Sequence, residues 1–529
     1  MRSRWRWLAP VVALGLVAAA CGDDDGGSED TAGGGSAPTS EGGTGGTSAG
    51  TGGGEPVEGA EITIALGSEP TSLDPQLVDD GGERAINDNI YETLLTRTPE
   101  GELAPGLAAE LPTQVDDTTW EFKLREGITF HNGDAFNAES VVATVNRMVG
   151  LVERGETDND GFYATLTGAE AVDETTVRIM TDGADGVLPA RMYWMKQIPA
   201  SAEKTPDMSE EPIGTGPYTF VSRNQGVSIE LAANPDYWGE APAIAGVTYE
   251  FADDAATRLA GLKSGKYDVI TNLSPQDVDQ APKHVTGKGQ EHPIIILDAD
   301  DGITADVNVR KALNLAVDKE AIAENLFGGF ASIDAGQLLS PAILGHNEQL
   351  EPYGYDPEEA KSMLEEAGVA GEKIQLVGES GRWLKDRELL EAVAGYWTEA
   401  GLDVQLEVLE FGAYLDVLFD RENRADTIYV SSSNDLLDPD RQLATYYEAG
   451  GIGSSNTDEQ MAKLIAAGRS ELDPEARAKG YQEAVKNAYD EAYFVWLVNN
   501  EDIYGLAENV EFQPRVDSKL LVSAMSVTK

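Results

Sequence analysis

The chain has 529 residues, with 93 acidic against 38 basic side chains and a formal net charge of −55. That balance excludes functions that depend on basic surfaces, such as nucleic-acid binding or adhesion to anionic membranes. Hydrophobic residues make up 41% of the sequence, which is compatible with two or three folded lobes of ordinary size.

The N-terminus has the pattern of a secretion signal over residues 1–20. Arginines at positions 2, 4 and 6 precede a short apolar run, 8–20, that is too short to span a bilayer comfortably. The run ends in AAACG, which resembles a bacterial lipobox, and Cys21 is the only cysteine in the sequence. We therefore expect a lipid anchor on Cys21; the alternative is ordinary signal cleavage beside an incidental cysteine.

Residues 21–57 predict a flexible tether. They consist almost entirely of Gly, Ser, Thr, Asp and Glu, so they cannot bury enough apolar surface to offset the entropy of ordering. Random-coil scaling gives this segment a reach of about 30 Å. A folded part attached to it is expected to lie a short distance above the membrane.

Alternating patterns begin immediately after the tether. Ile62, Ile64 and Leu66 alternate with small or polar residues, which predicts a strand ending at Gly67. The segment 89–95 (NIYETLL) has the apolar spacing of a helix. Residues 120–133 predict a hairpin, and Asn137 is the expected N-cap of the helix that follows.

The segment 212–239 combines turns, two strands and an aromatic turn. Gly214 and Gly216 give the backbone freedom, and Pro217 fixes φ before the first strand. Val227, Ile229 and Leu231 predict the second strand, and 234–236 (NPD) ends it before Tyr237 and Trp238, the pair that forms the aromatic turn.

Three later segments have distinct helix boundaries. Residues 309–322 predict a helix pair broken at Asp318. Asp356 and Asp473 are each followed by Pro-Glu, the pattern of an N-cap with proline in the first turn.

These segments together resemble the family 5 solute-binding proteins, the extracytoplasmic receptors of peptide and nickel ABC importers. The matching motifs are LDP at 73–75, YETL at 91–94, the hairpin 120–133, the segment 212–239, SGKYDV at 264–269 and the helix pair 309–322. They cover roughly residues 60–500. Position 308 departs from the family, which usually has an arginine where this chain has Asn308.

The resemblance implies an α/β fold of the type II periplasmic-binding-protein class, a bilobal clamshell with an extra subdomain on the first lobe. Alternation of strands and helices independently favours α/β lobes. The expected first lobe comprises residues 60–105, 212–305 and 500–529, its subdomain residues 106–211, and the second lobe residues 306–499.

No motif in the sequence predicts catalysis or a resident metal or cofactor. The four histidines show no zinc-helix spacing, and the only GxSxG string, at 46–50, lies inside the tether. The acidic run 298–302 lacks the spacing of a calcium loop. We expect a binding protein that has no cofactor and is not an enzyme.

The resemblance assigns ligand binding to the loop 431–440. In peptide-binding relatives an aspartate four residues before a proline accepts the α-ammonium of the ligand, and here Asp435 precedes Pro439 by four. The alternative is Asp438, which we expect to cap the following helix. Ser432 stands where peptide binders often have tryptophan, and with Asn434 it completes the expected site in this loop.

Arg382 and Trp383 are the second pair of candidate ligand contacts. Dipeptide receptors use an arginine near this point to hold the ligand carboxylate, and a guanidinium suits bidentate binding. A solvated loop charge is an equally open interpretation of Arg382. Trp383 and Trp496 are both able to stack on a ligand, but Val495 and Leu497 favour a core position for Trp496.

The resulting expectation is a lipid-anchored receptor on the extracytoplasmic face of a bacterial membrane. It captures a short peptide or similar amine-bearing solute between two lobes and delivers it to an ABC permease, with ATP hydrolysis in partner subunits. The alternatives are a binding or sensing lipoprotein without transport, and a receptor of the same fold for an opine, oligosaccharide or metal chelate.

Overall fold

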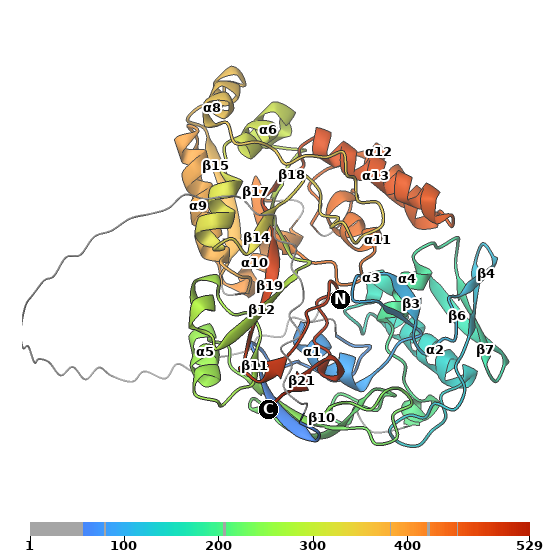
Figure 1. Cartoon of the computed structure of the whole chain (residues 1–529). Helices are drawn as coiled ribbons and strands as arrows, with labels where there is room; N and C mark the ends of the chain where they lie inside the picture. Colours follow the sequence, from blue (N-terminus) through green and yellow to red (C-terminus); the bar gives the residue numbers. More distant parts are fainter. Residues whose placement is uncertain (1–56, 79–80, 205–207, 381, 421–423, 452) are drawn as a thin grey trace, which may run out of the picture. The chain divides into compact units, whose positions relative to one another are not determined.

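A computed structural model of the chain describes residues 57–78, 81–204, 208–380, 382–420, 424–451 and 453–529 (Figure 1). The expected signal peptide, Cys21 and the tether up to residue 56 lie outside the described residues. Among those residues that are described, no helix is long and apolar enough to cross a bilayer.

The first sheet has eight strands and is built from both ends of the chain. Its order is β12-β19-β11-β1-β10-β9-β8, with β14 also paired to β19. Strand β1 is parallel to β10 and β11, and the other pairs are antiparallel. The strands are β1 Ala60–Leu66, β8 Tyr218–Asn224, β9 Ser228–Ala233, β10 Ile244–Phe251, β11 Val269–Ile270, β12 Lys283–Lys288, β14 Ala331–Ile333 and β19 Val498–Leu506.

The second sheet has five strands in the order β16-β15-β17-β13-β18. Strand β15 is parallel to β16 and β17, whereas β13 runs antiparallel to β17 and β18. The strands are β13 His292–Leu297, β15 Lys373–Glu379, β16 Asp403–Leu409, β17 Thr427–Ser432 and β18 Phe494–Trp496.

Helices surround the second sheet, and Figure 1 shows α9 beside β15 and α12 beside α13. Asp356 and Asp473 cap their helices as predicted from sequence, and Asp318, predicted as the break in a helix pair, caps the helix that begins at Lys319. The helices of this part are α6 Val307–Leu315, α7 Lys319–Ala321, α8 Pro357–Glu366, α9 Asp386–Glu399, α10 Phe411–Phe419, α11 Pro439–Gln442, α12 Glu459–Ser470 and α13 Pro474–Asp490, with π-helical turns at Ile322–Leu326 and Leu443–Tyr447.

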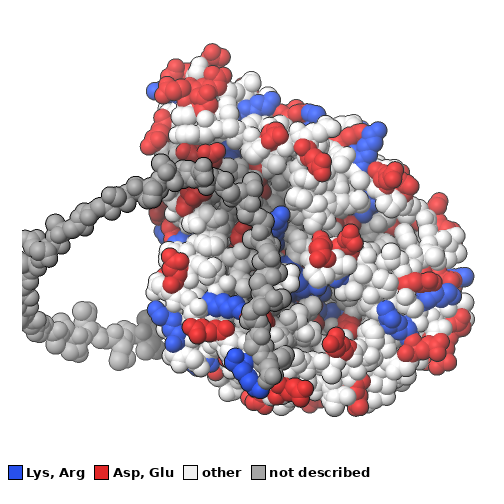
Figure 2. Space-filling model, in the orientation of Figure 1, with Lys and Arg blue, Asp and Glu red and all other residues white. Residues whose placement is uncertain are grey.

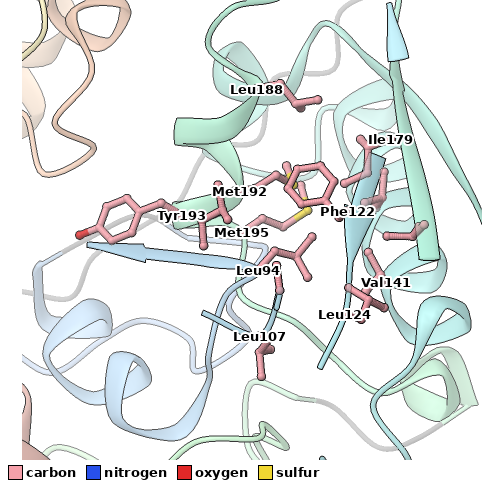
Figure 3. Packing of buried hydrophobic residues seen from close by; sticks show 14 of the residues in the cluster. Leu94, Leu107, Phe122, Leu124, Val141, Ile179, Leu188, Met192, Tyr193 and Met195 are labelled. Atoms are coloured by element: carbon pink, nitrogen blue, oxygen red, sulfur yellow. The ribbon is translucent and has the colours of Figure 1, made fainter. Parts of the chain in front are cut away.

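A third sheet, antiparallel with the order β4-β5-β7-β6, forms within residues 113–181. Asn137 caps the neighbouring helix as predicted, and the structure adds a capping box with Ser140. Buried side chains of this part pack as Figure 3 shows, where Tyr193 directs its hydroxyl away from Met192 and Met195. The elements are β4 Thr113–Asp116, β5 Thr119–Lys123, β6 Leu166–Asp173, β7 Thr176–Thr181, α2 Ala138–Arg154, α3 Asp160–Tyr163 and α4 Leu188–Trp194.

The remaining elements are short and lie between or beside the sheets. They are α1 Gly81–Ile90, β2 Leu95–Arg97, β3 Leu103–Pro105, α5 Ala255–Lys263, β20 Val510–Glu511 and β21 Ser526–Val527, with 3-10 turns at Ala200–Lys204, Pro275–Gln280, Ile303–Ala305 and Val522–Ala524. These elements and the three sheets make a mixed α/β fold, as expected from sequence.

The helix predicted over 89–95 is wrong, because α1 ends at Ile90. The backbone of the 214–216 loop packs directly against that end: the amide of Gly216 donates to the carbonyl of Ile90 at 2.8 Å. A Cβ on Gly214 would lie 2.1 Å from the same carbonyl oxygen, so only glycine fits there. The chain therefore leaves the helix at Tyr91.

Glu92, the next residue, connects the end of α1 to the segment 212–239 through hydrogen bonds. Its carboxylate accepts hydrogen bonds from the Tyr237 hydroxyl at 2.9 Å and from Trp238 Nε1 and the Thr215 hydroxyl at 2.8 Å each. Burial raises the pKa of Glu92, and the three donors oppose that rise. Two of the sequence motifs thus meet at one half-buried carboxylate and serve the fold.

The division into two lobes stays a proposal, and the sheets favour one change to it. Strand β13 pairs with β17 and β18, so residues 292–297 lie in the second sheet although the expected boundary placed them in the first lobe. We place the boundary between the two lobes before β13, because a strand packs in the same hydrophobic core as the sheet to which it belongs.

Candidate functional site

The predicted ligand segment 431–440 spans the end of β17, a loop at 433–438 and the start of α11, and Asp435 lies on the loop. Its carboxylate does not stand alone: Arg84 Nη2, in the first turn of α1, lies 2.6 Å from Asp435 Oδ2. The two side chains are 21% and 13% exposed, so the ion pair is largely removed from water. Arg84 was not a predicted site residue.

Asp438 has the structural role that the sequence suggested for it. It caps α11 by accepting from the amide of Asp440 at 3.0 Å, and its two oxygens receive both terminal nitrogens of Arg477 at 2.7 and 2.8 Å. All of these groups are buried. Asp438 therefore serves the fold, and ligand contact by Asp435 stays a prediction.

The same loop is held by Arg97, a residue that sequence reasoning missed. Its guanidinium, on β2, donates to the backbone carbonyls of Leu436 at 2.7 Å and Leu437 at 3.1 Å. Leu437 has a φ of 52°, a strained value for a residue with a branched side chain. Arg84 and Arg97, both from the N-terminal part of the chain, thus contact consecutive residues of the loop.

Ser432 and Asn434 fix the loop from within. Asn434 Nδ2 donates to the Asp438 carbonyl at 2.9 Å and to Gln442 Oε1 at 3.1 Å, and Gln442 donates to the Ser432 hydroxyl at 3.2 Å. Both predicted residues are fully buried, and Asn434 Oδ1 has no partner in the structure. Ligand contact by Ser432 or Asn434 stays a prediction.

Two further carboxylates interact with Asp435, and we name Glu291, Asp435 and Asp502 the carboxylate cluster. Glu291 precedes β13 of the second sheet, and Asp502 lies on β19 of the first. Burial, followed by the charges of Asp502 and Asp435, raises the pKa of Glu291 to about 7. Burial raises the pKa of Asp502 to about 6, against the hydrogen bond from Ser518.

The cluster has an electrostatic consequence for any ligand. Burial and mutual repulsion disfavour the charged forms of these carboxylates. A cation that binds nearby therefore stabilises them. Arg382 and the hydroxyl of Ser431, 3.5 Å from Glu291 Oε2, are the groups that lower the pKa of Glu291. The site therefore combines excess negative charge with the guanidinium of Arg84 at Asp435, and the charge of Arg382 also acts on Glu291.

Arg382 and Trp383 lie in the turn between β15 and α9. Asp386 orders that turn, because its Oδ2 accepts from the amides of both residues at 3.1 Å. The Arg382 guanidinium lies 5.6 Å from the Trp383 ring centroid, and the side chain is exposed. Trp383 is half-buried and meets Tyr414 and Tyr429 edge to face.

Glu379, at the end of β15, is a further acid beside this turn. It is 1% exposed, its Oε1 has no hydrogen-bond partner in the structure, and burial raises its pKa to about 7. The positive charge of Arg382 opposes that rise in pKa. The Arg382 side chain is exposed, so ligand anchor and solvated loop charge both stay predictions for it.

Trp496 has the core position expected of it, and His131 contacts the backbone of the 214–216 loop. Trp496 is 1% exposed and packs against Phe494 and Tyr353 in the core of the second sheet. His131 Nε2 lies 3.0 Å from the Gly216 carbonyl. Within the described residues, no three His, Cys, Asp or Glu side chains are placed to hold a metal ion.

Two cavities lie away from the predicted site residues. One of about 600 Å³ is lined by residues such as Asp300, Arg310 and Tyr493, and one of about 580 Å³ by Arg125, Trp238 and others. Neither is lined by a residue of the carboxylate cluster. Figure 2 shows acidic side chains spread over the displayed face with fewer basic ones among them.

Comparison with known proteins matches the chain to one protein family and to individual binding proteins. The family described as bacterial extracellular solute-binding proteins, family 5 Middle, matches residues 102–454. The chain is similar to heme-binding protein A of Haemophilus influenzae, with 25% identity over 84% of this chain and 87% of that protein. It is 26% identical to the dipeptide-binding protein of Escherichia coli, over 82% of this chain and 88% of that one.

A solved structure shares the fold. The periplasmic binding protein DppA of Helicobacter pylori, associated with an ABC transporter and in complex with the peptide STSA, superposes with a TM-score of 0.74 at 24% identity. The alignment covers 89% of this chain and 99% of that one.

Proposed function

Because this chain belongs to the family 5 bacterial extracellular solute-binding proteins, we propose that its solute is a short peptide or a similar amine-bearing molecule, which it delivers to the permease of an ABC importer. The family is one of binding proteins, and its relatives include dipeptide- and di/tripeptide-binding proteins. The observation that supports the proposal is the carboxylate cluster: the charge of Asp435 contributes to the raised pKa of both Glu291, beside β13 of the second sheet, and Asp502, on β19 of the first.

The chemistry of the cluster favours a cationic ligand. An ammonium group placed at Asp435 neutralises the repulsion that raises the pKa of Glu291 and Asp502. A charge-assisted hydrogen bond in a site shielded from water is stronger than one in bulk solvent. Asp435 is the proposed ammonium anchor, and Arg382 is the proposed partner for a ligand carboxylate.

Capture works by closure around the solute. A ligand that contacts groups of both sheets favours the conformation in which those groups are near one another. Moving a two-state equilibrium from mostly open to mostly closed takes about 5.5 kcal/mol of differential affinity. One shielded ammonium–carboxylate contact and several hydrogen bonds are a sufficient source.

Membrane attachment is part of the same proposal. Cys21 follows the expected signal peptide and is proposed to carry the lipid, with the tether linking it to the folded part. Replacing Cys21 by alanine is expected to release the protein from the cell surface into the medium. Retention of the variant on the membrane would contradict lipidation at this position.

The experiment that tests the ligand assignment is native mass spectrometry of the purified mature protein, which detects what co-purifies. We expect masses of short peptides or similar amines. Asp435→Asn is expected to weaken such a ligand by at least about tenfold, since an amide lacks the charge. Unchanged affinity would remove Asp435 from the site, and a co-purifying opine, sugar or metal chelate would favour the alternative ligands.

A further inference from the structure

Glu379 is a buried carboxylate without a counter-ion of its own. Its side chain is 1% exposed, and Oε1 has no hydrogen-bond partner in the structure. Among the residues that the structure describes, no lysine or arginine forms an ion pair with it. A buried polar atom without a partner destabilises the fold, and a charged one does so more strongly. Such a group calls for a partner that comes from outside the described chain.

The place of Glu379 in the second sheet is one at which α/β sheets bind ligands. Glu379 ends β15, which is parallel to β16 and β17, and it pairs with Leu409 at the end of β16. Ser432 ends β17, and the loop that follows carries Asp435. Ligands of open α/β sheets bind beyond the carboxyl ends of the parallel strands. Glu379 thus lies at the sheet edge from which the loop of Asp435 leaves.

Aromatic side chains lie beside this end of β15. Trp383, in the turn after β15, packs edge to face against Tyr414 and Tyr429, with ring centroids 6.2 and 5.6 Å from its own. Burial, and then neighbouring charges that include Glu379, raises the pKa of both tyrosines. The Tyr429 hydroxyl is buried and has no partner in the structure, whereas Trp383 is half-buried and reaches the surface. Aromatic rings attract cations, so these surroundings favour a positively charged ligand group.

The charges that act on Glu379 are one acid and one base. Burial raises its pKa to about 7, the charge of Asp386 adds to that rise, and the charge of Arg382 opposes it. Asp386, at the start of α9, accepts from the amides of Arg382 and Trp383 at 3.1 Å, so its carboxylate serves the turn. Arg382 is exposed. A cation at Glu379 is therefore favoured both by the burial of the carboxylate and by the acid next to it.

We propose that Glu379 is a second cation-binding residue of the solute site, which takes an ammonium or guanidinium group other than the one assigned to Asp435. The inference rests on the proposed function and narrows it. The preferred solutes carry two cationic groups, as a short peptide with a lysine or arginine side chain does. A charge-assisted hydrogen bond to a carboxylate shielded from water supplies the discrimination against an uncharged side chain.

The binding experiment compares peptides that differ in one charge. Alanine di- and tripeptides carry either arginine or citrulline, its uncharged isostere, at each position in turn, and binding is measured by isothermal titration calorimetry. Wild type is expected to bind the arginine member of at least one pair about tenfold more tightly, and Glu379→Gln to reduce that preference to about twofold or less. Glu407→Gln, at an exposed position of β16, is the matched control and should keep the preference. Equal binding of both members by wild type, or a preference that survives in Glu379→Gln, would overturn the inference.

Proton release gives a readout that needs no substituted protein. An acid with a pKa of about 7 is half protonated at pH 7, and a cation that binds to it displaces the proton into the buffer. At pH 7 the arginine peptide should therefore release about half a proton more than its citrulline partner. The difference is measured by calorimetry in two buffers of unlike ionisation enthalpy. Equal release by the two peptides would contradict a cation at Glu379.

A probe without a peptide bond separates this inference from the proposed function. Methylguanidinium chloride at millimolar concentration is expected to raise the Tm of ligand-free wild type above its value in equal sodium chloride, and to leave the Tm of Glu379→Gln unchanged. An equal shift in both proteins, or none in wild type, would overturn the cation subsite. If none of the peptides binds, the peptide assignment fails, and the methylguanidinium measurement still decides whether Glu379 binds a cation.

Discussion

Glu291 offers the most quantitative test of the electrostatics of the site. Its pKa rises from 4.5 to about 7 on folding, chiefly because it is buried and then because Asp502 and Asp435 are near. An acid with a raised native pKa binds its proton more tightly in the folded state. The free energy of unfolding therefore falls as the pH rises from the unfolded to the folded pKa. For this shift the loss between pH 5 and pH 8 is about 2 to 3 kcal/mol.

Glu291→Gln should remove that loss. The amide is neutral at every pH, keeps the shape of the side chain and is able to accept from the Ser431 hydroxyl. Relative to wild type, the variant is expected to gain about 2 to 3 kcal/mol of stability on going from pH 5 to pH 8. Asp502 is present in both proteins, so its titration contributes to the pH dependence of stability in both.

The assay is urea unfolding followed by tryptophan fluorescence at pH 5, 6, 7 and 8. Glu110→Gln, at an exposed surface position, controls for the loss of one negative charge from the whole protein. A stability difference between Glu291→Gln and wild type that stays constant across these pH values would refute the argument. A difference that Glu110→Gln reproduces would assign the effect to net charge instead.

Three other predictions concern buried contacts outside the cluster. Glu92→Ala removes the acceptor of three hydrogen bonds and should lower stability by about 3 kcal/mol or more, seen as a fall in Tm; a fall of under a degree would contradict this. Arg477→Met leaves the buried Asp438 carboxylate without its counter-ion and should cost about 3 to 5 kcal/mol, whereas Arg477→Met combined with Asp438→Asn should recover part of it. Gly214→Ala places a methyl group against the Ile90 carbonyl and should reduce the soluble yield of folded protein, and a normal circular dichroism melt would show that the loop moves aside.

Local patterns predicted local structure well. Asn137, Asp356 and Asp473 were identified as helix caps from their own short segments, because a cap is defined by the residues beside it. The same reasoning identified Asp438 as a cap. It failed at 89–95, where the end of the helix is set by a loop more than a hundred residues later, which no local pattern reveals.

The candidate site was predicted only in part, for the same reason. Asp435 could be singled out because the resemblance fixes its distance from Pro439. Arg84 lies 351 positions earlier and Arg97 almost as far, and an isolated arginine carries no signal of the partner it will meet. Glu291 and Asp502 likewise became candidates only when the two sheets placed them near one another.

The sheet order also has a consequence for biogenesis. Strand β19, from residues 498–506, lies between β11 and β12, so the first sheet lacks an internal member until nearly the whole polypeptide has emerged. Some four hundred residues separate β1 from β19, and contacts of such high sequence separation form slowly. Completion of this sheet is therefore a late event of folding, and truncation before residue 498 removes the strand that joins β12 to β11.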